Sequence, residues 1–224
     1  MIKVWDYLRE YEELRTDILE AVDQVFKNGV LIFGPRLDEF EDKFSKYNQC
    51  DYGIGVGNCT DAITIALKAC GIGNGDEVIT TSNTAVPTVT AIVNTGATVK
   101  FVDIDKYSLM DVSKLSNVIS KKTKAIVPVH LFGQMCDMNI IMQIAKKNKL
   151  KVIEDCAQSH GATYKGKKAG SIGDVGCYSF YPTKIFGAYG DGGFITTNNE
   201  KLFDKMKRIR FLGMEKKKMS SGHW

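Results

Sequence analysis

The fold of this 224-residue chain is decided by the stretch Val152-Ile153-Glu154-Asp155-Cys156-Ala157-Gln158-Ser159-His160. Two later segments complete it: Gly176-Cys177-Tyr178-Ser179-Phe180-Tyr181-Pro182-Thr183-Lys184 and Gly187-Ala188-Tyr189-Gly190-Asp191-Gly192-Gly193. An apolar run ends at the carboxylate Asp155, and a single lysine, Lys184, lies in the glycine-rich loop formed by the later segments. Because open α/β sheets place ligands at the carboxyl ends of their strands, we expect a binding site at Asp155.

On both sides of this stretch, short apolar segments alternate with helical patterns. The alternation predicts strands at 52–56, 77–80, 99–102, 125–129 and 151–154, with two more at 176–180 and 194–197 around the lysine loop. Apolar side chains also recur at helical spacing from about residue 6 to residue 27, ahead of Gly29, and a shorter helix follows Pro35. Together these patterns predict an α/β fold in which helices cover both faces of a mainly parallel sheet.

The composition is that of an ordinary globular protein. It is 44% hydrophobic and 25% charged. The apolar runs are shorter than the roughly 18 residues of a membrane helix, and the first residues lack the apolar core of a signal peptide. We therefore expect a cytoplasmic protein with no membrane partner.

The distribution of charge argues against a nucleic-acid-binding protein, and the spacing of the cysteines argues against a metal-binding protein. The net charge of +4 comes from residues 200–224, which carry +5 while the rest carries −1, so a solvated basic end explains it better than a nucleic-acid surface. The six cysteines stand singly, without a C-x-x-C pair or a histidine cluster. This spacing predicts reduced, mostly buried thiols and no metal site.

Asp155 and Lys184 are the candidate catalytic residues. A pyridoxal phosphate enzyme needs a carboxylate that keeps the pyridine nitrogen protonated and an amine that forms a Schiff base with the cofactor. Asp155 suits the first task, although an Asp here would also make a good helix cap. Lys184 suits the second, because it lies among Pro182, Thr183 and the glycines from Gly187 onward, in a loop rather than on a charged helix face.

A candidate phosphate site falls on the segment Gly57-Asn58-Cys59-Thr60-Asp61-Ala62. This segment joins a predicted strand to the start of a helix, where N–H groups and the helix dipole attract an anion. An ordinary cap by Asn58 or Thr60 is the alternative. The glycine-rich segments lack the G-x-G-x-x-G spacing of dinucleotide-binding folds, so a dehydrogenase is not expected.

Two histidines lie close to the same predicted strand ends. His160 could pack over a cofactor, touch a substrate or have a structural role, and His130 is similarly placed. Neither is assigned a catalytic role.

Taken together, these segments resemble the DegT family of sugar aminotransferases, which are type I pyridoxal phosphate enzymes of the aspartate aminotransferase fold that act on nucleotide-linked keto sugars. The resemblance runs from Gly34-Pro35 to about Gly213 and rests on Glu154-Asp155-Cys156-Ala157-Gln158, Ser179-Phe180, Lys184 and Gly190-Asp191-Gly192-Gly193, in that order. It implies about seven strands, with Lys184 as the Schiff-base lysine and Asp155 at the pyridine nitrogen. It also implies that Gln158 contacts the phenolic oxygen of the cofactor and that Thr60, Asp61 and Ser179 hold its phosphate.

One segment, Ser82-Asn83-Thr84-Ala85-Val86-Pro87-Thr88, departs from many family members, which carry an aromatic residue that stacks on the pyridine ring at the position of Ala85. This version is similar to members that aminate C-3 of dTDP-linked 3-keto-6-deoxy sugars, and a C-4 specificity is the alternative. The resemblance implies glutamate as the amino donor, and products used in surface polysaccharides or glycosylated natural products. Lys184 argues against the related sugar dehydratases, in which a histidine replaces this lysine.

The resemblance also divides the chain into three parts. Residues 1–34 are expected to form an N-terminal helical segment, residues 35–213 the cofactor-binding large domain, and residues 214–224 an atypical basic tail. Full-length relatives continue from the position of Gly213 into a smaller domain that closes the substrate site, and they are homodimers with shared sites. We therefore expect a homodimer. The alternative to an active enzyme is a truncated, inactive remnant that only binds the cofactor.

Overall fold

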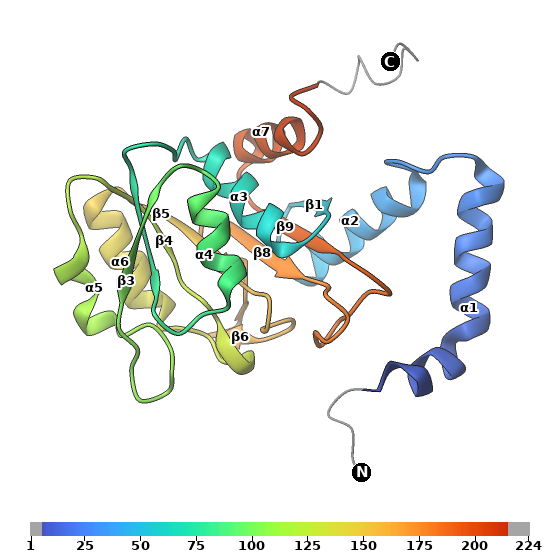
Figure 1. Cartoon of the computed structure of the whole chain (residues 1–224), viewed down its shortest axis with the longest axis horizontal. Coiled ribbons are helices and arrows are strands. Elements are labelled where there is room, and N and C mark those ends of the chain that lie inside the picture. The colour runs from blue at the N-terminus through green and yellow to red at the C-terminus, as the bar shows by residue number, and fades with distance from the viewer. Residues whose placement is uncertain (1–5, 215–224) are drawn as a thin grey trace.

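A seven-stranded sheet lies at the centre of the protein (Figure 1). The structure is a computed structural model and describes residues 6–214. The strands of the sheet are β1 (Tyr52–Val56), β2 (Glu77–Thr81), β3 (Thr98–Val102), β4 (Thr123–Val127), β5 (Lys151–Asp155), β8 (Val175–Ser179) and β9 (Gly193–Thr197). Their spatial order is β1-β9-β8-β5-β4-β2-β3, and each neighbouring pair is parallel except those that β9 makes with β1 and β8. The predicted α/β fold with a mainly parallel sheet is confirmed, and the bounds of each predicted strand lie within two residues of those observed.

Helices cover both faces of the sheet, because side chains on the buried strands alternate between two apolar layers. In β5, Ile153 packs in one layer and Val152 in the other. The first layer holds α3 (Cys59–Ala69), α4 (Val86–Val93) and α7 (Glu200–Arg210), and the second holds α2 (Pro35–Tyr47), α5 (Val112–Val118) and α6 (Met138–Asn148). By the same alternation Asp155 points toward α3 and α4, whereas Glu154 points toward the opposite layer.

Three short elements lie between the main ones. A 3₁₀ turn, η1 (Leu131–Gly133), follows β4, and β6 (Thr163–Tyr164) pairs with β7 (Lys167–Lys168) in a small hairpin between β5 and β8. Both connections start at the carboxyl end of a parallel strand, which is where the predicted site lies.

Helix α1 (Tyr7–Asn28) stands apart from the sheet at one end of the molecule (Figure 1). None of its residues is fully buried, and it ends at Gly29, whose φ of 67° is the left-handed conformation that commonly terminates helices. Its Tyr11 ring meets the ring of Tyr189, with centroids 6.1 Å apart. The domain boundaries at residues 34 and 213 stay predictions, and the proposed tail beyond Met214 lies outside the described residues.

All six cysteines are free thiols, and five of them are buried, as expected from their spacing. Within residues 6–214, no helix combines the length and the apolar character needed to cross a membrane.

Candidate active site

Asp155 ends β5 and is only 4% exposed. Its Oδ2 accepts a hydrogen bond from Thr88 Oγ1 of α4 at 2.7 Å, and its Oδ1 accepts one from the backbone N–H of Ala157 at 3.1 Å. Burial raises the pKa of this carboxyl group, and the two hydrogen bonds oppose the rise. The bond from Ala157 closes a short turn after β5, because residues 156–160 form no helix that Asp155 could cap, and it occupies only one of the two carboxylate oxygens.

The backbone of Asp155 is held between the neighbouring strands. Its N–H donates to Pro128 O at 2.9 Å, and its carbonyl accepts from the N–H of His130 at 3.0 Å. On the other side, the N–H of Cys156 donates to Cys177 O at 2.7 Å. These bonds fix the end of β5 between β4 and β8, so the direction of the Asp155 side chain is set by the sheet.

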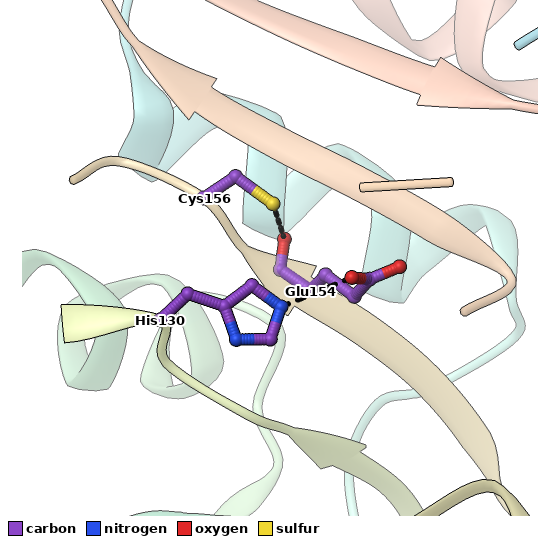
Figure 2. A group of neighbouring side chains, drawn as sticks. All are labelled: His130, Glu154 and Cys156. Carbon is purple, nitrogen blue, oxygen red and sulfur yellow. Dashed lines mark hydrogen bonds and ion pairs between the residues drawn. The ribbon is translucent and has the colours of Figure 1, made fainter. Parts of the chain in front are cut away.

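The neighbouring Glu154 is fully buried on the opposite face, and Figure 2 shows its side chain beside that of His130. Its carboxylate accepts from His130 Nε2 at 3.0 Å, and also from three backbone N–H groups of the loop after β7, those of Gly170, Ile172 and Gly173. Burial opposes ionisation of Glu154, but the hydrogen bonds from His130 and from this loop outweigh it and lower the pKa. Glu154 therefore ties β5 to the loop that leads into β8.

His130, Glu154 and Cys156 lie close enough together to raise the question of a metal site (Figure 2). The N–H of Cys136 donates to His130 Nδ1 at 3.2 Å, so the ring proton resides on Nε2 and is donated to Glu154. Burial raises the pKa of the Cys156 thiol well above its usual range, and its Sγ lies 3.7 Å from the backbone oxygen of Glu154. These atoms already have partners within the protein, and the cluster serves to position β5.

A cavity of about 390 Å³ opens beside Asp155. It is lined by residues from α3, α4 and the ends of β5, β8 and β9: Asn58, Cys59, Thr60, Ile63, Ala85, Pro87, Thr88, Asp155, Ala157, Ser179, Tyr181, Lys184, Asp191 and Gly192. Four residues predicted from the sequence, Thr60, Asp155, Ser179 and Lys184, are thus brought together around one space. Its volume is within the range of small-molecule pockets, roughly 300–1,000 Å³.

The start of α3 forms one wall of this cavity. Asn58 caps the helix, because its Oδ1 accepts the N–H of Asp61 at 2.8 Å. The backbone N–H groups of Cys59 and Thr60 precede the first intrahelical acceptor, and both residues line the cavity. The cap and the anion site considered from the sequence are therefore compatible, since the cap uses the third N–H of the helix and leaves the first two N–H groups available to an anion.

The lysine loop, residues 180–192, forms the opposite wall. It folds back on itself, with Lys184 N donating to Tyr181 O at 2.8 Å and Ala188 N donating to Phe180 O at 2.7 Å. Close packing requires a glycine within the loop and another directly after it: a Cβ on Gly187 would lie 2.5 Å from Pro182 O, and one on Gly193, the first residue of β9, would lie 2.4 Å from the backbone carbon of Asn58. The glycine-rich pattern thus lets β9 lie directly against the start of α3.

Asp61, Gln158 and His160, like the His130 described above, were singled out from the sequence and lie outside the cavity lining. The Asp61 side chain is exposed and its Oδ2 accepts from Asn58 Nδ2 at 3.1 Å, while Gln158 Oε1 accepts from the N–H of Phe132 at 3.1 Å. His160 packs among the rings of Phe44, Tyr178 and Phe180, and burial lowers its pKa to about 4. The cofactor contacts expected for Asp61 and Gln158 stay predictions.

Thr88 contacts Asp155 directly, and no role in the site was predicted for it from the sequence. It is 1% exposed, lines the cavity and donates to Asp155. On the sequence alone it is one more threonine near a proline, and its partner lies 67 positions further along the chain. Only the packing of α4 against β5 brings the two residues together.

Residues 12–223 match the model of the DegT/DnrJ/EryC1/StrS aminotransferase family. The chain is 47% identical over 213 residues to a dTDP-3-amino-3,4,6-trideoxy-alpha-D-glucose transaminase of Micromonospora megalomicea subsp. nigra, covering 95% of this chain and 57% of that protein. It is also 47% identical to a dTDP-3-amino-3,6-dideoxy-alpha-D-galactopyranose transaminase of Aneurinibacillus thermoaerophilus, covering 97% of this chain and 60% of the relative.

Solved structures agree with these matches. The crystal structure of DesV from S. venezuelae in complex with a ketimine intermediate superposes with a TM-score of 0.91 at 37% identity, covering 95% of this chain and 57% of that one. The chain therefore spans between half and two thirds of the length of these relatives. With a family match over almost its whole length and a cavity at the carboxyl edge of the expected fold, the chain belongs to the DegT/DnrJ/EryC1/StrS aminotransferase family.

Proposed function

We propose that this chain is the cofactor-binding part of a pyridoxal phosphate-dependent aminotransferase that moves an amino group from glutamate to C-3 of a dTDP-linked 3-keto-6-deoxyhexose. The observation that carries the proposal is the cavity that joins a buried carboxylate, Asp155, to a primary amine, Lys184, and to the start of α3. A carboxylate, an amine and an anion site are the three groups that pyridoxal phosphate requires of a protein.

The residues present fit this cofactor. Aminotransferases of the family depend on pyridoxal phosphate, and relatives have been solved with the cofactor in its PLP and PMP forms. In this chain the Asp155 carboxylate accepts one hydrogen bond on each oxygen, so each oxygen has a further lone pair for a donor from the cavity. The N–H groups at the start of α3 and the hydroxyl groups of Thr60 and Ser179 supply donors of the kind that bind phosphate.

Each residue then has a distinct task. When bound, pyridoxal phosphate supplies an electron sink for charge that develops beside the reacting amine. Asp155 holds a positive charge on the ring nitrogen, and Lys184 holds the cofactor covalently and moves a proton as base and acid. Thr60 and Ser179 orient the phosphate. For Asp61, at the phosphate, and for Gln158, at the phenolic oxygen, the proposed contacts rest on the family resemblance alone.

The substrate class is proposed from the relatives. Both curated relatives described above are named for dTDP-linked 3-amino sugars, which favours amination at C-3 over C-4. The small side chain of Ala85 lines the cavity at the position where many family members carry an aromatic ring. Cofactor and substrate must therefore be covered here by other groups, and we propose that a second subunit supplies them, in a cytoplasmic homodimer.

Borohydride reduction tests the proposal directly. With pyridoxal phosphate added, reduction followed by peptide mapping should fix the cofactor on Lys184, and a Lys184→Ala variant should carry no label. Lys168→Ala is the matched control and should still carry the label on Lys184. Lys168 is also a lysine near the sheet, but its ammonium lies over the Tyr47 ring, 3.2 Å from the centroid. Label on another lysine, or none on any, would overturn the assignment of Lys184. Comparison of dTDP-3-keto and dTDP-4-keto sugars as acceptors then decides the carbon.

A further inference from the structure

We propose that Thr88 is a positioning residue for Asp155, and that the hydroxyl chain from Thr84 through Thr88 keeps the Asp155 carboxylate ionised and directed into the cavity. The inference deepens the proposed function and rests on it, since it concerns how the carboxylate is prepared for the ring nitrogen of a bound pyridine cofactor.

The positions of the two threonine hydroxyl groups define which group donates and which accepts in the two hydrogen bonds. Thr88 Oγ1 lies 2.7 Å from Asp155 Oδ2, and Thr84 Oγ1 lies 2.8 Å from Thr88 Oγ1. An ionised carboxylate can only accept, so Thr88 gives its single hydroxyl proton to Asp155. Thr84 must then donate to Thr88, and this second bond polarises the first.

The Thr88 hydroxyl is not needed to begin α4. The N-cap of that helix is Ala85, which makes no side-chain capping bond, and Thr88 satisfies its own backbone N–H on Ala85 O at 3.1 Å. The hydroxyl instead crosses from α4 to the end of β5, where Thr88 is 1% exposed. A buried hydroxyl that serves no helix end and meets a buried carboxylate is placed for a role at that carboxylate.

The surroundings of Asp155 leave this role to few groups. The ionisable groups whose charges act on Asp155, or on which Asp155 acts, are His130 after β4, Cys177 on β8, Cys59 on α3, the adjacent Cys156, and Lys184 in the lysine loop. Among the described residues, only Thr88 and the N–H of Ala157 are hydrogen-bonded to the carboxylate oxygens. Burial raises the pKa of Asp155, with the Thr88 hydrogen bond the largest influence opposing it, so loss of this hydroxyl should raise the pKa further.

The test measures the ionisation of Asp155 itself. Protein labelled with ¹³C at the aspartate carboxyl carbons is titrated without cofactor, and the Asp155 signal is assigned by its loss in an Asp155→Asn variant. Thr88→Val should raise the apparent pKa of Asp155, and Thr88→Ser, which restores a hydroxyl, should return it toward the parent value. Thr80→Val is the matched control, because Thr80 is also buried but donates to Val127 O rather than to a carboxylate, at 2.9 Å.

The second readout is cofactor binding. Because hydrogen bonds to charged groups contribute about 1.5–3 kcal/mol, Thr88→Val should weaken pyridoxal phosphate binding about tenfold or more and Thr88→Ser much less. Equal effects of Thr88→Val and Thr80→Val on the Asp155 titration would overturn the inference, because both would then act only through packing. If Thr88→Val does not fold, Thr84→Val must shift the apparent pKa of Asp155 in the same direction by a smaller amount. The absence of any shift in Thr84→Val would overturn the proposed role of the two hydroxyl groups. A parent protein that fails to bind pyridoxal phosphate would refute the proposed function, while the carboxyl titration would still decide the role of Thr88.

Discussion

Glu154 and Asp155 are adjacent, buried carboxylates whose surroundings differ because they point to opposite faces of β5. Glu154 accepts four hydrogen bonds, which lower its pKa, whereas Asp155 accepts two, which do not fully offset the effect of burial. Glu154 therefore has its acceptor positions filled by the protein and holds the strand in place. Asp155 has capacity left for a further donor, and it is the one that faces the cavity.

The first prediction at this scale concerns Asp155. An Asp155→Asn variant should still bind the cofactor covalently at Lys184, but it should slow the reaction with glutamate by several orders of magnitude, because a neutral amide does not keep the ring nitrogen protonated. Stopped-flow absorbance after glutamate addition measures the rate. Asp174→Asn is a suitable control, since Asp174 pairs with Lys151 away from the cavity. A variant that reacts as fast as the parent would show that Asp155 does not have this role.

The second prediction concerns stability and His160. Burial lowers the pKa of His160 to about 4, while in the unfolded chain it returns to about 6.5. Below about pH 6.5 His160 is protonated in the unfolded chain, but in the folded chain it stays neutral until about pH 4. Protonation of this group therefore favours the unfolded chain increasingly as the pH falls through that window. From pH 7 to pH 5 the loss should be about 1–2 kcal/mol, allowing for partial exposure of the ring. Urea unfolding of the parent and of His160→Phe at both pH values measures it, and identical losses in the two proteins would assign the effect elsewhere.

Most of the helices and strands could be predicted from the pattern of apolar residues in the sequence. The seven strands were predictable because each is a short apolar run between turn signals, and α1 and α2 because of their helical spacing and the breaks at Gly29 and Pro35. Helices α4 and α5 were not predicted, since the first has a largely apolar sequence without helical periodicity and the second has only seven residues. The hairpin of β6 and β7, with two residues in each strand, gives no usable alternation.

The same reasoning explains what could be known of the site. Asp155 and the segment that holds Thr60 could be predicted from strand ends, because parallel strands bring their carboxyl ends to one edge of the sheet, whereas Ser179 came only from the family resemblance. Lys184 needed the family resemblance to stand out from the other lysines. Thr88 was out of reach, because its role depends on the packing of α4 against β5, and the sequence pattern did not reveal α4.

The third prediction tests the contact between β9 and the start of α3. A Gly193→Ala variant would place its Cβ within 2.4 Å and 2.5 Å of the backbone carbon and oxygen of Asn58, so one of the two backbone segments must move. We expect a loss of stability of about 1–3 kcal/mol and weaker binding of pyridoxal phosphate, because the N–H groups at the start of α3 are displaced. Urea unfolding and cofactor titration measure both effects. Gly73→Ala is the control, as its Cβ would meet nothing closer than Thr95 O at 3.5 Å, and equal behaviour of the two variants would contradict the packing argument.

At the scale of the whole molecule, large apolar side chains remain exposed around the site. Val86 and Ile185, next to the cavity-lining residues Ala85 and Lys184, are 76% and 72% exposed, and Phe132, beside the Gln158 contact, is 76% exposed. Helix α1 likewise has no buried side chain. Exposed apolar surface of this extent marks an interaction site or a tendency to aggregate, which agrees with the proposal that a second subunit covers the cofactor and the substrate.

The last prediction concerns the activity of the 224-residue chain, which spans 57% of one curated relative and 60% of another. Correct positioning of reacting groups is worth roughly 7–11 kcal/mol of activation barrier in favourable cases, so a chain with an open cleft can bind its cofactor and still turn over very little. We expect weak pyridoxal phosphate binding, self-association and little amination of dTDP-3-keto-6-deoxy sugars by this chain alone. A chimaera that adds the remaining C-terminal part of the Aneurinibacillus thermoaerophilus relative should restore turnover, and the same chimaera with Lys184→Ala should not. The measurement is a coupled assay of glutamate consumption, with sedimentation to follow association. Robust turnover by the short chain, at a rate close to that of the chimaera, would show that the cleft is complete without the added part.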